Sequence, residues 1–166
     1  MAQLSPRLQA RLAKVPDIAR AAAAKAMEEG AADVVAEMKR LAPEISGDLR
    51  DSINWTWGDV PEGSFVIDEI RSGKNQGDQY ATLRIKIYAG SKEAFYARWV
   101  EFGTAPHSLA ETADISRNKR QGEGEMHPGA TARPFFFPGW KKMRPKFRAR
   151  IRAAVRKAIK EAWANG

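Results

Sequence analysis

Apolar side chains recur at steps of three to five residues along positions 17–41, and this period predicts a long N-terminal helix. Charged residues occupy most of the remaining positions, and Pro43 follows the end of the pattern. Ser5 and Pro6 predict an earlier start, because serine caps helices and proline suits the first helical position. Pro16 is expected to separate this short first helix from the long one, since proline removes a backbone donor and clashes with the preceding turn. The apolar stripe consists of Ala22, Met27, Ala31, Val34, Met38 and Leu41.

The middle of the chain alternates between apolar and polar side chains, which is the pattern of half-buried strands. Strands are predicted at residues 52–57, 65–71 and 81–89. Short links join them, so we expect an antiparallel meander of three to four strands with helices over one face. Trp55, on the inward face of the first strand, is an expected core residue. The predicted fold class is therefore α+β.

Residues 96–103 pack three aromatic side chains, one acid and a closing glycine into a short stretch after the last strand. A short helix or turn is predicted here, stopped by Gly103, with Phe102 as a second expected core residue. Residues 104–132 follow with two prolines, three glycines and little apolar periodicity, which predicts a long loop. Such loops are uncommon in compact domains and are usually functional, so we expect this one to be an assembly loop.

The last segment combines an apolar stripe of helical period with a high positive charge. Pro138 is expected to mark the start of a helix, and Pro145 to kink it or delay its start. Residues 126–166 contain 11 of the 28 lysines and arginines but one of the 20 acids, in a chain of net charge +8. This asymmetry indicates a polyanionic partner, either DNA or an acidic protein surface, unless the charges merely solvate a helix face. The candidate contacts are Lys141, Lys142, Arg144, Lys146, Arg148 and Arg152.

The sequence contains no recognisable catalytic or metal-binding motif. It has no cysteine, which excludes disulfides, thiolate nucleophiles and cysteine-based zinc sites. Its two histidines, His107 and His127, lie in the long loop, and no spacing around them matches a tight metal site. Nucleophile elbows, phosphate-binding glycine loops and two-histidine metalloprotease helices are also absent from the sequence. We therefore expect no catalytic residue, no metal and no cofactor.

The length of 166 residues suits a single domain with one core, in which residues 1–16 form an N-terminal extension. No apolar run approaches the roughly 18 residues that span a bilayer. The first residues lack the charged-then-apolar pattern of a signal peptide. We therefore expect synthesis in the cytoplasm and no contact with a membrane.

Three motifs stand in a distinctive order. Pro43 and residues 46–53 (Ser-Gly-Asp-Leu-Arg-Asp-Ser-Ile) close the long helix, and residues 96–104 follow the strands. Residues 127–129 (His-Pro-Gly) and 132–135 (Ala-Arg-Pro-Phe) then lead into the basic helix. Together they resemble a family of small neck or tail-completion proteins of long-tailed bacteriophages, also described as minor tail or head–tail joining proteins.

The resemblance extends over nearly the whole chain, with two departures: Ser46 stands where threonine is expected, and Trp99 where a smaller aromatic is usual. It implies a structural virion protein of the neck, in a ring through which DNA passes. The implied partners are further copies in a ring, a hexamer by expectation, together with the head–tail connector and tail-tube or tail-terminator proteins. A tail terminator that caps the tube is one alternative. A DNA-binding protein without sequence specificity, acting through the basic helix, is another.

The expected sites are structural or belong to assembly. Glu101 is expected to pair with Arg50 or Arg133. A structural latch between strands and helices is expected at Tyr96, Trp99, Val100, Glu101, Phe102 and Gly103. A turn motif anchored in the core is expected at Ser46, Gly47, Leu49, Arg50, Ser52 and Ile53. Contacts with neighbouring subunits are expected at Ser72, Lys74, Gln76, His107, Leu109, Ile115, Arg117 and Met126.

Overall fold

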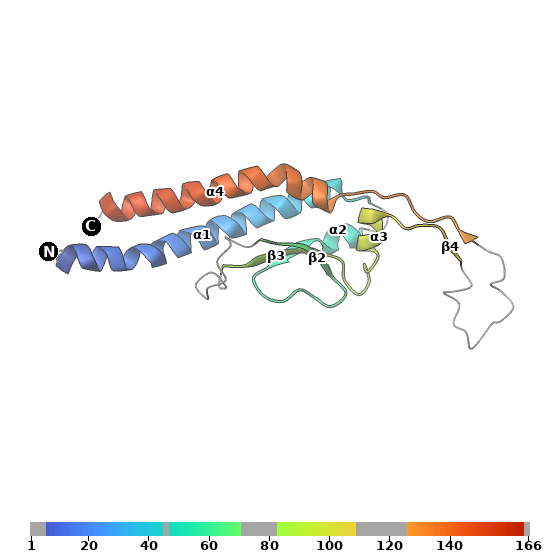
Figure 1. Ribbon diagram of the computed structural model, residues 1–166, viewed down its shortest axis with the longest axis horizontal. Helices are drawn as coiled ribbons and strands as arrows, with labels where there is room; N and C mark the ends of the chain where they lie inside the picture. Colours follow the sequence, from blue (N-terminus) through green and yellow to red (C-terminus); the bar gives the residue numbers. More distant parts are fainter. Residues whose placement is uncertain (1–5, 45–46, 71–82, 109–125, 165–166) are drawn as a thin grey trace.

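A computed structural model describes residues 6–44, 47–70, 83–108 and 126–164 (Figure 1). Two long helices lie side by side over a small antiparallel sheet, which confirms the predicted α+β class. In chain order the elements are α1 (Pro6–Leu41), α2 (Asp48–Ser52), β1 (Asn54–Thr56), β2 (Phe65–Ile70), β3 (Ile85–Ala89), α3 (Ala97–Phe102), β4 (His107–Ser108), β5 (Met126–His127) and α4 (Phe136–Ala164).

Helix α1 is continuous through Pro16, so the predicted break at that residue is wrong. The ring of Pro16 is exposed and does not interrupt the packed face. Helix α4 runs antiparallel along α1 over most of its length, and the two termini lie at the same end of the molecule (Figure 1). Tertiary packing along the whole helix pair outweighs the loss of one backbone hydrogen bond, because most helical stability in proteins comes from such packing.

The two long helices approach closely at two glycines. A Cβ atom on Gly30 of α1 would lie 2.5 Å from a ring carbon of Phe147, and one on Gly139 of α4 would lie 2.8 Å from the Cγ atom of Met38. The ring of Phe147 therefore occupies the space that a side chain at position 30 would need. Glycine inside a helix costs about 1 kcal/mol relative to alanine, but at position 30 this close packing requires it.

The three-stranded sheet has the order β1-β3-β2, so the expected meander, in which neighbours in sequence pair, is wrong in its connectivity. Strand β3 is central and pairs antiparallel with both edge strands. It alternates buried Ile85, Ile87 and Ala89 with partly exposed residues, and a strand with this inward face gains most from the central position. Strand β1 is shorter than the predicted strand at 52–57, and β3 begins at Ile85, so Leu83 and Arg84 are not part of it. Residues 71, 81 and 82 of the predicted strands lie outside the described residues.

The core lies between the helices and the sheet. It combines Ala31, Val34 and Met38 of α1 with Ile85 and Ile87 of β3, all of them buried. The largest side chains with almost no exposure are Phe135 and Phe136 at the start of α4. Trp55 packs against this cluster from a partly buried position.

Helix α4 starts at Phe136, two residues before the predicted start at Pro138. Pro138 lies in the first turn, where its missing N–H group removes no intrahelical bond. Pro145 lies inside the helix and is exposed, and it does not delay the start.

The segment predicted as a structureless loop begins and ends as a two-stranded ribbon. Thr104 pairs with Ala130 in an isolated bridge, and His107 and Ser108 pair with His127 and Met126. The ribbon projects away from the body of the molecule at the end opposite the termini (Figure 1). Residues 109–125 lie outside the described residues. The expectation of an unstructured loop was wrong for the base of this segment, because backbone pairing needs little apolar periodicity.

Candidate assembly surface

Residues 96–103 have an inner and an outer face. Ala97 and Glu101 are buried, and Tyr96 and Val100 pack against the core. Trp99 and Phe102 are 51% and 56% exposed. The expectation that Phe102 lies in the core is therefore wrong, and its ring contacts Phe137 of α4 instead. A helix of six residues can bury one face only, and the face that carries Glu101 is the buried one.

Glu101 accepts three hydrogen bonds from the backbone at the start of α4. Its Oε2 atom lies 2.8 Å from the Phe135 nitrogen and 2.9 Å from the Phe136 nitrogen, and its Oε1 atom lies 3.0 Å from the Phe137 nitrogen. The expected pairing with an arginine is not observed among the described residues. The Arg50 side chain bonds Glu44, and the backbone nitrogen of Arg133 donates to the carbonyl of Val100.

This arrangement follows from the sequence around the helix start. The first N–H groups of any helix have no intrahelical acceptor, and serine, threonine, aspartate or asparagine usually supplies one. Here Arg133, Pro134 and Phe135 precede the helix, and none of them is a capping residue. Glu101 of α3 supplies the missing acceptor instead, and its negative charge is also favourable at the positive end of the helix dipole. The missing local cap was the signal that could have identified Glu101.

Gly103 and the residues after Gly129 complete this junction. Gly103 has φ +72°, and a Cβ atom there would lie 2.6 Å from the carbonyl oxygen of Ala130. The Thr104 nitrogen donates to the same oxygen at 3.0 Å, so the two ends of the ribbon meet at the end of α3. The predicted stop of the short helix at Gly103 is confirmed.

The turn motif forms helix α2 at the edge of the core. Leu49 and Ile53 are buried, as expected. Gly47 precedes the helix with φ +93°, a conformation that favours glycine. The Ser52 hydroxyl donates to the carbonyl of Leu49 and accepts from the nitrogen of Gly90, which joins this turn to the end of β3. Ser46 lies outside the described residues.

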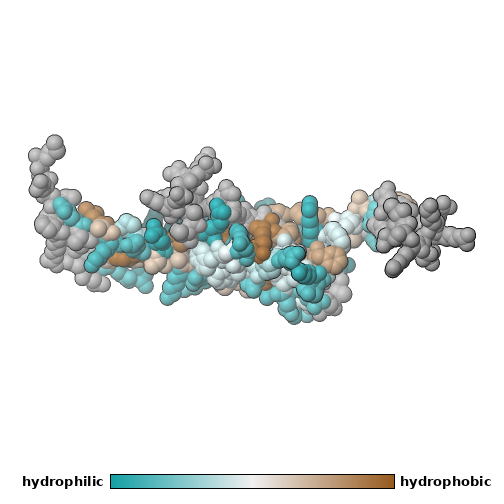
Figure 2. Space-filling view, turned by 90° about the horizontal axis from the view of Figure 1, so that it is seen from below, coloured by the Kyte–Doolittle hydropathy of each residue, from teal (hydrophilic) through white to brown (hydrophobic). Residues whose placement is uncertain are grey.

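Four exposed aromatic side chains form what we call the aromatic surface. Phe95 contacts Trp99 with ring centroids 5.4 Å apart, and Phe102 contacts Phe137 at 5.8 Å. All four are between 41% and 57% exposed. Hydrophobic side chains reach the surface near the base of the ribbon (Figure 2). Trp99 also borders a recess of about 430 Å³, whose other lining residues are Pro43, Tyr96, Val100, Ala130, Thr131 and Arg133.

The ribbon carries two of the expected neighbour contacts. The rings of His107 and His127 stack with centroids 4.9 Å apart, and Met126 is 62% exposed. The Gly129 nitrogen donates to Nδ1 of His127, so this ring supports the turn that follows it. The described residues contain no group of three or more potential metal-ligating side chains. The other expected contacts, Ser72, Lys74, Gln76, Leu109, Ile115 and Arg117, lie outside the part of the chain that the structure describes.

Seven of the basic residues of α4 divide into two rows. Lys142 lies 2.9 Å from Glu37 of α1, and Lys146 and Arg150 lie 3.8 Å and 2.8 Å from Asp33. Because α1 neutralises this row, Lys142 and Lys146 do not form the free cationic surface that was expected of them.

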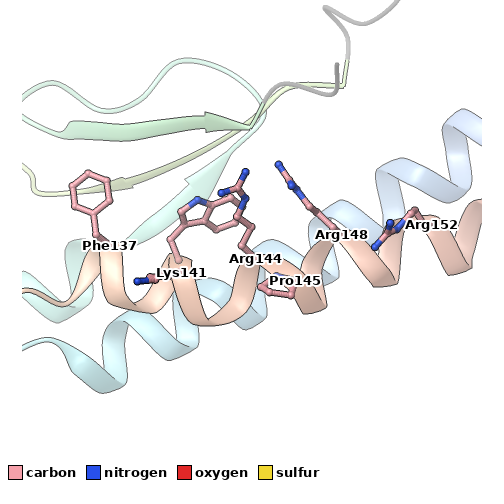
Figure 3. Close-up of a pocket in the computed structure, with 7 residues that line it drawn as sticks. Phe137, Lys141, Arg144, Pro145, Arg148 and Arg152 are labelled. Atoms are coloured by element: carbon pink, nitrogen blue, oxygen red, sulfur yellow. The ribbon is translucent and has the colours of Figure 1, made fainter. Parts of the chain in front are cut away.

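The second row consists of Lys141, Arg144, Arg148 and Arg152, which we call the basic stripe. It lines a groove of about 630 Å³ together with Phe137, Trp140 and Pro145. Arg144 and Arg148 project on the same side of α4 as Phe137 (Figure 3). Within the described ranges, none of the four cations has a carboxylate partner.

Glu37 is the most strongly perturbed of the carboxyl groups at the helix pair. Hydrogen bonds from Arg40 and then Lys142 lower its pKa from 4.5 to about 2. Its Oε1 atom lies 2.7 Å from Arg40 and 2.9 Å from Lys142. The ionised form of Glu37 therefore ties α4 to α1.

A family model matches residues 7–103, which include α1, the sheet and α3. Its description is "Bacteriophage HK97-gp10, putative tail-component". The chain belongs to the HK97-gp10-like family. This match confirms the predicted membership in a family of phage neck and tail-completion proteins. This HK97-gp10-like chain is a bacteriophage tail-component protein, with a structural role among other virion proteins.

Comparison with curated proteins and with solved structures gives no match. None of the helices in the described ranges is long and apolar enough to cross a membrane. The family match ends at Gly103, so the ribbon and α4 lie outside the matched residues.

Proposed function

We propose that this protein is a subunit of the phage neck, where six copies form the ring that completes the tail and joins it to the head. DNA passes through the lumen of this ring without sequence-specific contacts. The neighbouring partners are the head–tail connector on one side and the tail-tube or tail-terminator proteins on the other. The chain acts as one domain within this ring, and residues 96–103 are the latch that holds α3 against the start of α4.

The observation that carries the proposal is the ribbon that projects from one end of the body beside the aromatic surface. A closed ring of identical subunits needs two different faces on each copy, one that reaches out and one that receives. The ribbon is suited to reach a neighbouring copy. The aromatic surface and the adjoining recess, with exposed Phe95, Trp99 and Phe102, are suited to receive one, because contiguous exposed apolar patches mark interaction sites.

The proposal is tested by locating the chain in assembled particles. A compact tag on the C-terminus, decorated with a gold-labelled antibody and imaged by electron microscopy, is expected at the junction of head and tail. Label on the capsid wall or at the distal tail tip would refute the assignment. Tails purified without heads separate the two neck roles, since a terminator of the tube remains on headless tails and a head–tail joining ring does not.

A further inference from the structure

The two basic rows of α4 point in different directions. Successive residues of a helix are about 100° apart, so residues 142, 146 and 150 form one row and residues 141, 144, 148 and 152 form another about 150° away. The first row faces the carboxylates of Asp33 and Glu37 on α1. The second row is the basic stripe, which extends about 16 Å along the helix. The four charges of the stripe therefore face away from the acids that neutralise the first row.

The basic stripe has an apolar floor and an apolar end. Trp140 and Pro145 line the same groove as the four cations. Phe137 lines it as well and also contacts Phe102 of the aromatic surface. The groove and the aromatic surface are thus continuous through Phe137, and a ligand that fits here needs both negative charge and apolar side chains.

A second copy of this chain is a poor source of that charge. Within the described ranges, several of the exposed carboxylates already have basic partners on the same chain, among them those of Asp17, Glu44, Asp59 and Glu62. The whole chain also carries a net charge of +8, which opposes the binding of a second copy at this basic stripe. The charge balance favours a different, acidic protein.

DNA phosphates would pair with the four cations of the stripe, but DNA offers no partner for the apolar side chains of the groove. A duplex presents phosphates along its outside, so Phe137 and Trp140 would gain no apolar partner from it. Four phosphate contacts per copy would also hold DNA tightly, with a steep dependence on salt. A ring through which DNA must pass is served better by cations that a protein partner covers.

We propose that the basic stripe docks an acidic, amphipathic segment of a neighbouring virion protein, with carboxylates on Arg144 and Arg148 and apolar side chains over Phe137 and Trp140. The inference rests on the proposed function for the statement that the partner belongs to the virion and for the argument from DNA passage. It decides between the two polyanions that the basic helix suggested, in favour of the acidic protein surface. The partner is recognised by charge complementarity and by burial of its apolar face.

The test measures binding of three labelled probes to the full chain by fluorescence anisotropy at about 50 mM salt, where phosphate contacts are strong. The first probe is a peptide of about 16 residues with glutamate and leucine at helical spacing, long enough to cover the stripe. The second has the same glutamates and glutamine in place of leucine. The third is a DNA duplex of about 20 base pairs.

The amphipathic peptide is expected to bind most tightly. The variant Arg144→Glu with Arg148→Glu should weaken it at least about tenfold. Lys25→Glu with Lys160→Glu, the same change of charge off the stripe, should weaken it less than about threefold. Phe137→Ala should reduce binding of the peptide and leave binding of the duplex unchanged. If the double variant unfolds in a thermal melt, Arg148→Gln and Arg152→Gln are measured singly.

Three outcomes would overturn the inference in solution. Equal or tighter binding of the leucine-free peptide or the duplex would make the stripe a general polyanion site. An equal loss of peptide affinity in the Lys25 and Lys160 variant would show that net charge alone, and not the basic stripe, causes the weakening. A change in the oligomeric state of the Arg144 and Arg148 variant, measured by sedimentation, would show instead that the occupant is a second copy. These results are independent of the imaging test, so a chain located away from the neck could still bind the acidic peptide.

Discussion

Glu101 accepts hydrogen bonds from the backbone nitrogens of Phe135, Phe136 and Phe137, and it is 3% exposed. A buried carboxylate is costly unless its oxygen atoms are well bonded, and here both oxygens have donors. The three amides belong to a segment more than 30 residues later in the chain. One side chain therefore sets where α4 begins and how α3 lies against it.

We expect Glu101→Gln to lower the free energy of unfolding by about 1–3 kcal/mol. The amide group replaces one acceptor oxygen with donor hydrogens, which leaves at least one of the three backbone N–H groups without an acceptor. Denaturant unfolding measures the loss. Glu62→Gln is the matched control, because the Glu62 side chain is 81% exposed and forms an ion pair with Lys92. Loss of this surface ion pair should lower the free energy of unfolding by less than about 1 kcal/mol. An equal loss of stability in the two variants would show that the hydrogen bonds of Glu101 stabilise the fold no more than a surface ion pair does.

The aromatic residues of the junction should separate cleanly by burial. Phe135 is 0% exposed and Phe102 is 56% exposed. Phe135→Ala should destabilise the fold by about 3–5 kcal/mol, because it empties a fully buried site. Phe102→Ala should cost less than about 1.5 kcal/mol, the value of its ring contact with Phe137. Denaturant melts of both variants check this, and a larger cost at Phe102 would mean that its ring is buried in solution.

Helices α1 and α4 are held together by close packing and by a few charged contacts. The packing is tightest where glycines let side chains of the other helix approach, at Gly30 and Gly139. The charged contacts join Glu37 of α1 to Lys142 of α4, and Asp33 of α1 to Arg150 of α4. Each kind of contact leads to a separate prediction.

Gly30→Ala is expected to destabilise the protein by about 1–2 kcal/mol, even though alanine favours a helix by about 1 kcal/mol over glycine. The new Cβ atom would lie 2.5 Å and 2.8 Å from two ring carbons of Phe147. A double-mutant cycle with Phe147→Leu measures the coupling, and the cost of Gly30→Ala should fall in the smaller background. A stabilising effect of Gly30→Ala alone would contradict the close packing.

The pairing of Glu37 predicts a pH dependence. Its folded-state pKa of about 2 lies below its ordinary value of 4.5. Its contribution to stability is therefore fully present above about pH 5 and is lost as the pH falls toward 2. Wild type should be more stable than Glu37→Gln at neutral pH, and the difference should vanish near pH 2. Denaturant melts across this range test the sign, and a difference that grows on acidification would be inconsistent with the pairing.

Across the whole molecule, the body and the ribbon are structurally separate. The core involves the two long helices, the sheet and the junction at Glu101, whereas the ribbon beyond Thr104 leaves the body (Figure 1). A structure divided in this way can lose the end of the ribbon without losing its core. The aromatic surface and the basic stripe remain on the body, so binding at each can be tested by itself.

Deletion of residues 109–125, with a two-residue Asn-Gly turn between Ser108 and Met126, should leave unfolding cooperative. These two residues are the last observed pair of the ribbon, and a two-residue turn can close such a pair. The deletion should prevent the chain from entering particles, because the proposed reach to a neighbour is lost. Thermal melts and electron micrographs of complemented particles provide the two measurements. Normal particles, or a broad melt, would each contradict part of this prediction.

The long helices, the existence of strands, the turn at Leu49 and Ile53, and the relation to phage tail proteins could all be predicted from the sequence. These features depend on local period and on short motifs, which are readable along the chain. Four features could not be predicted in this way: α1 continues through Pro16, β3 is central, Glu101 caps α4, and Lys142 and Lys146 are neutralised. Each of these depends on a partner distant in the sequence, since packing energy and the satisfaction of buried polar groups are settled only when the segments meet.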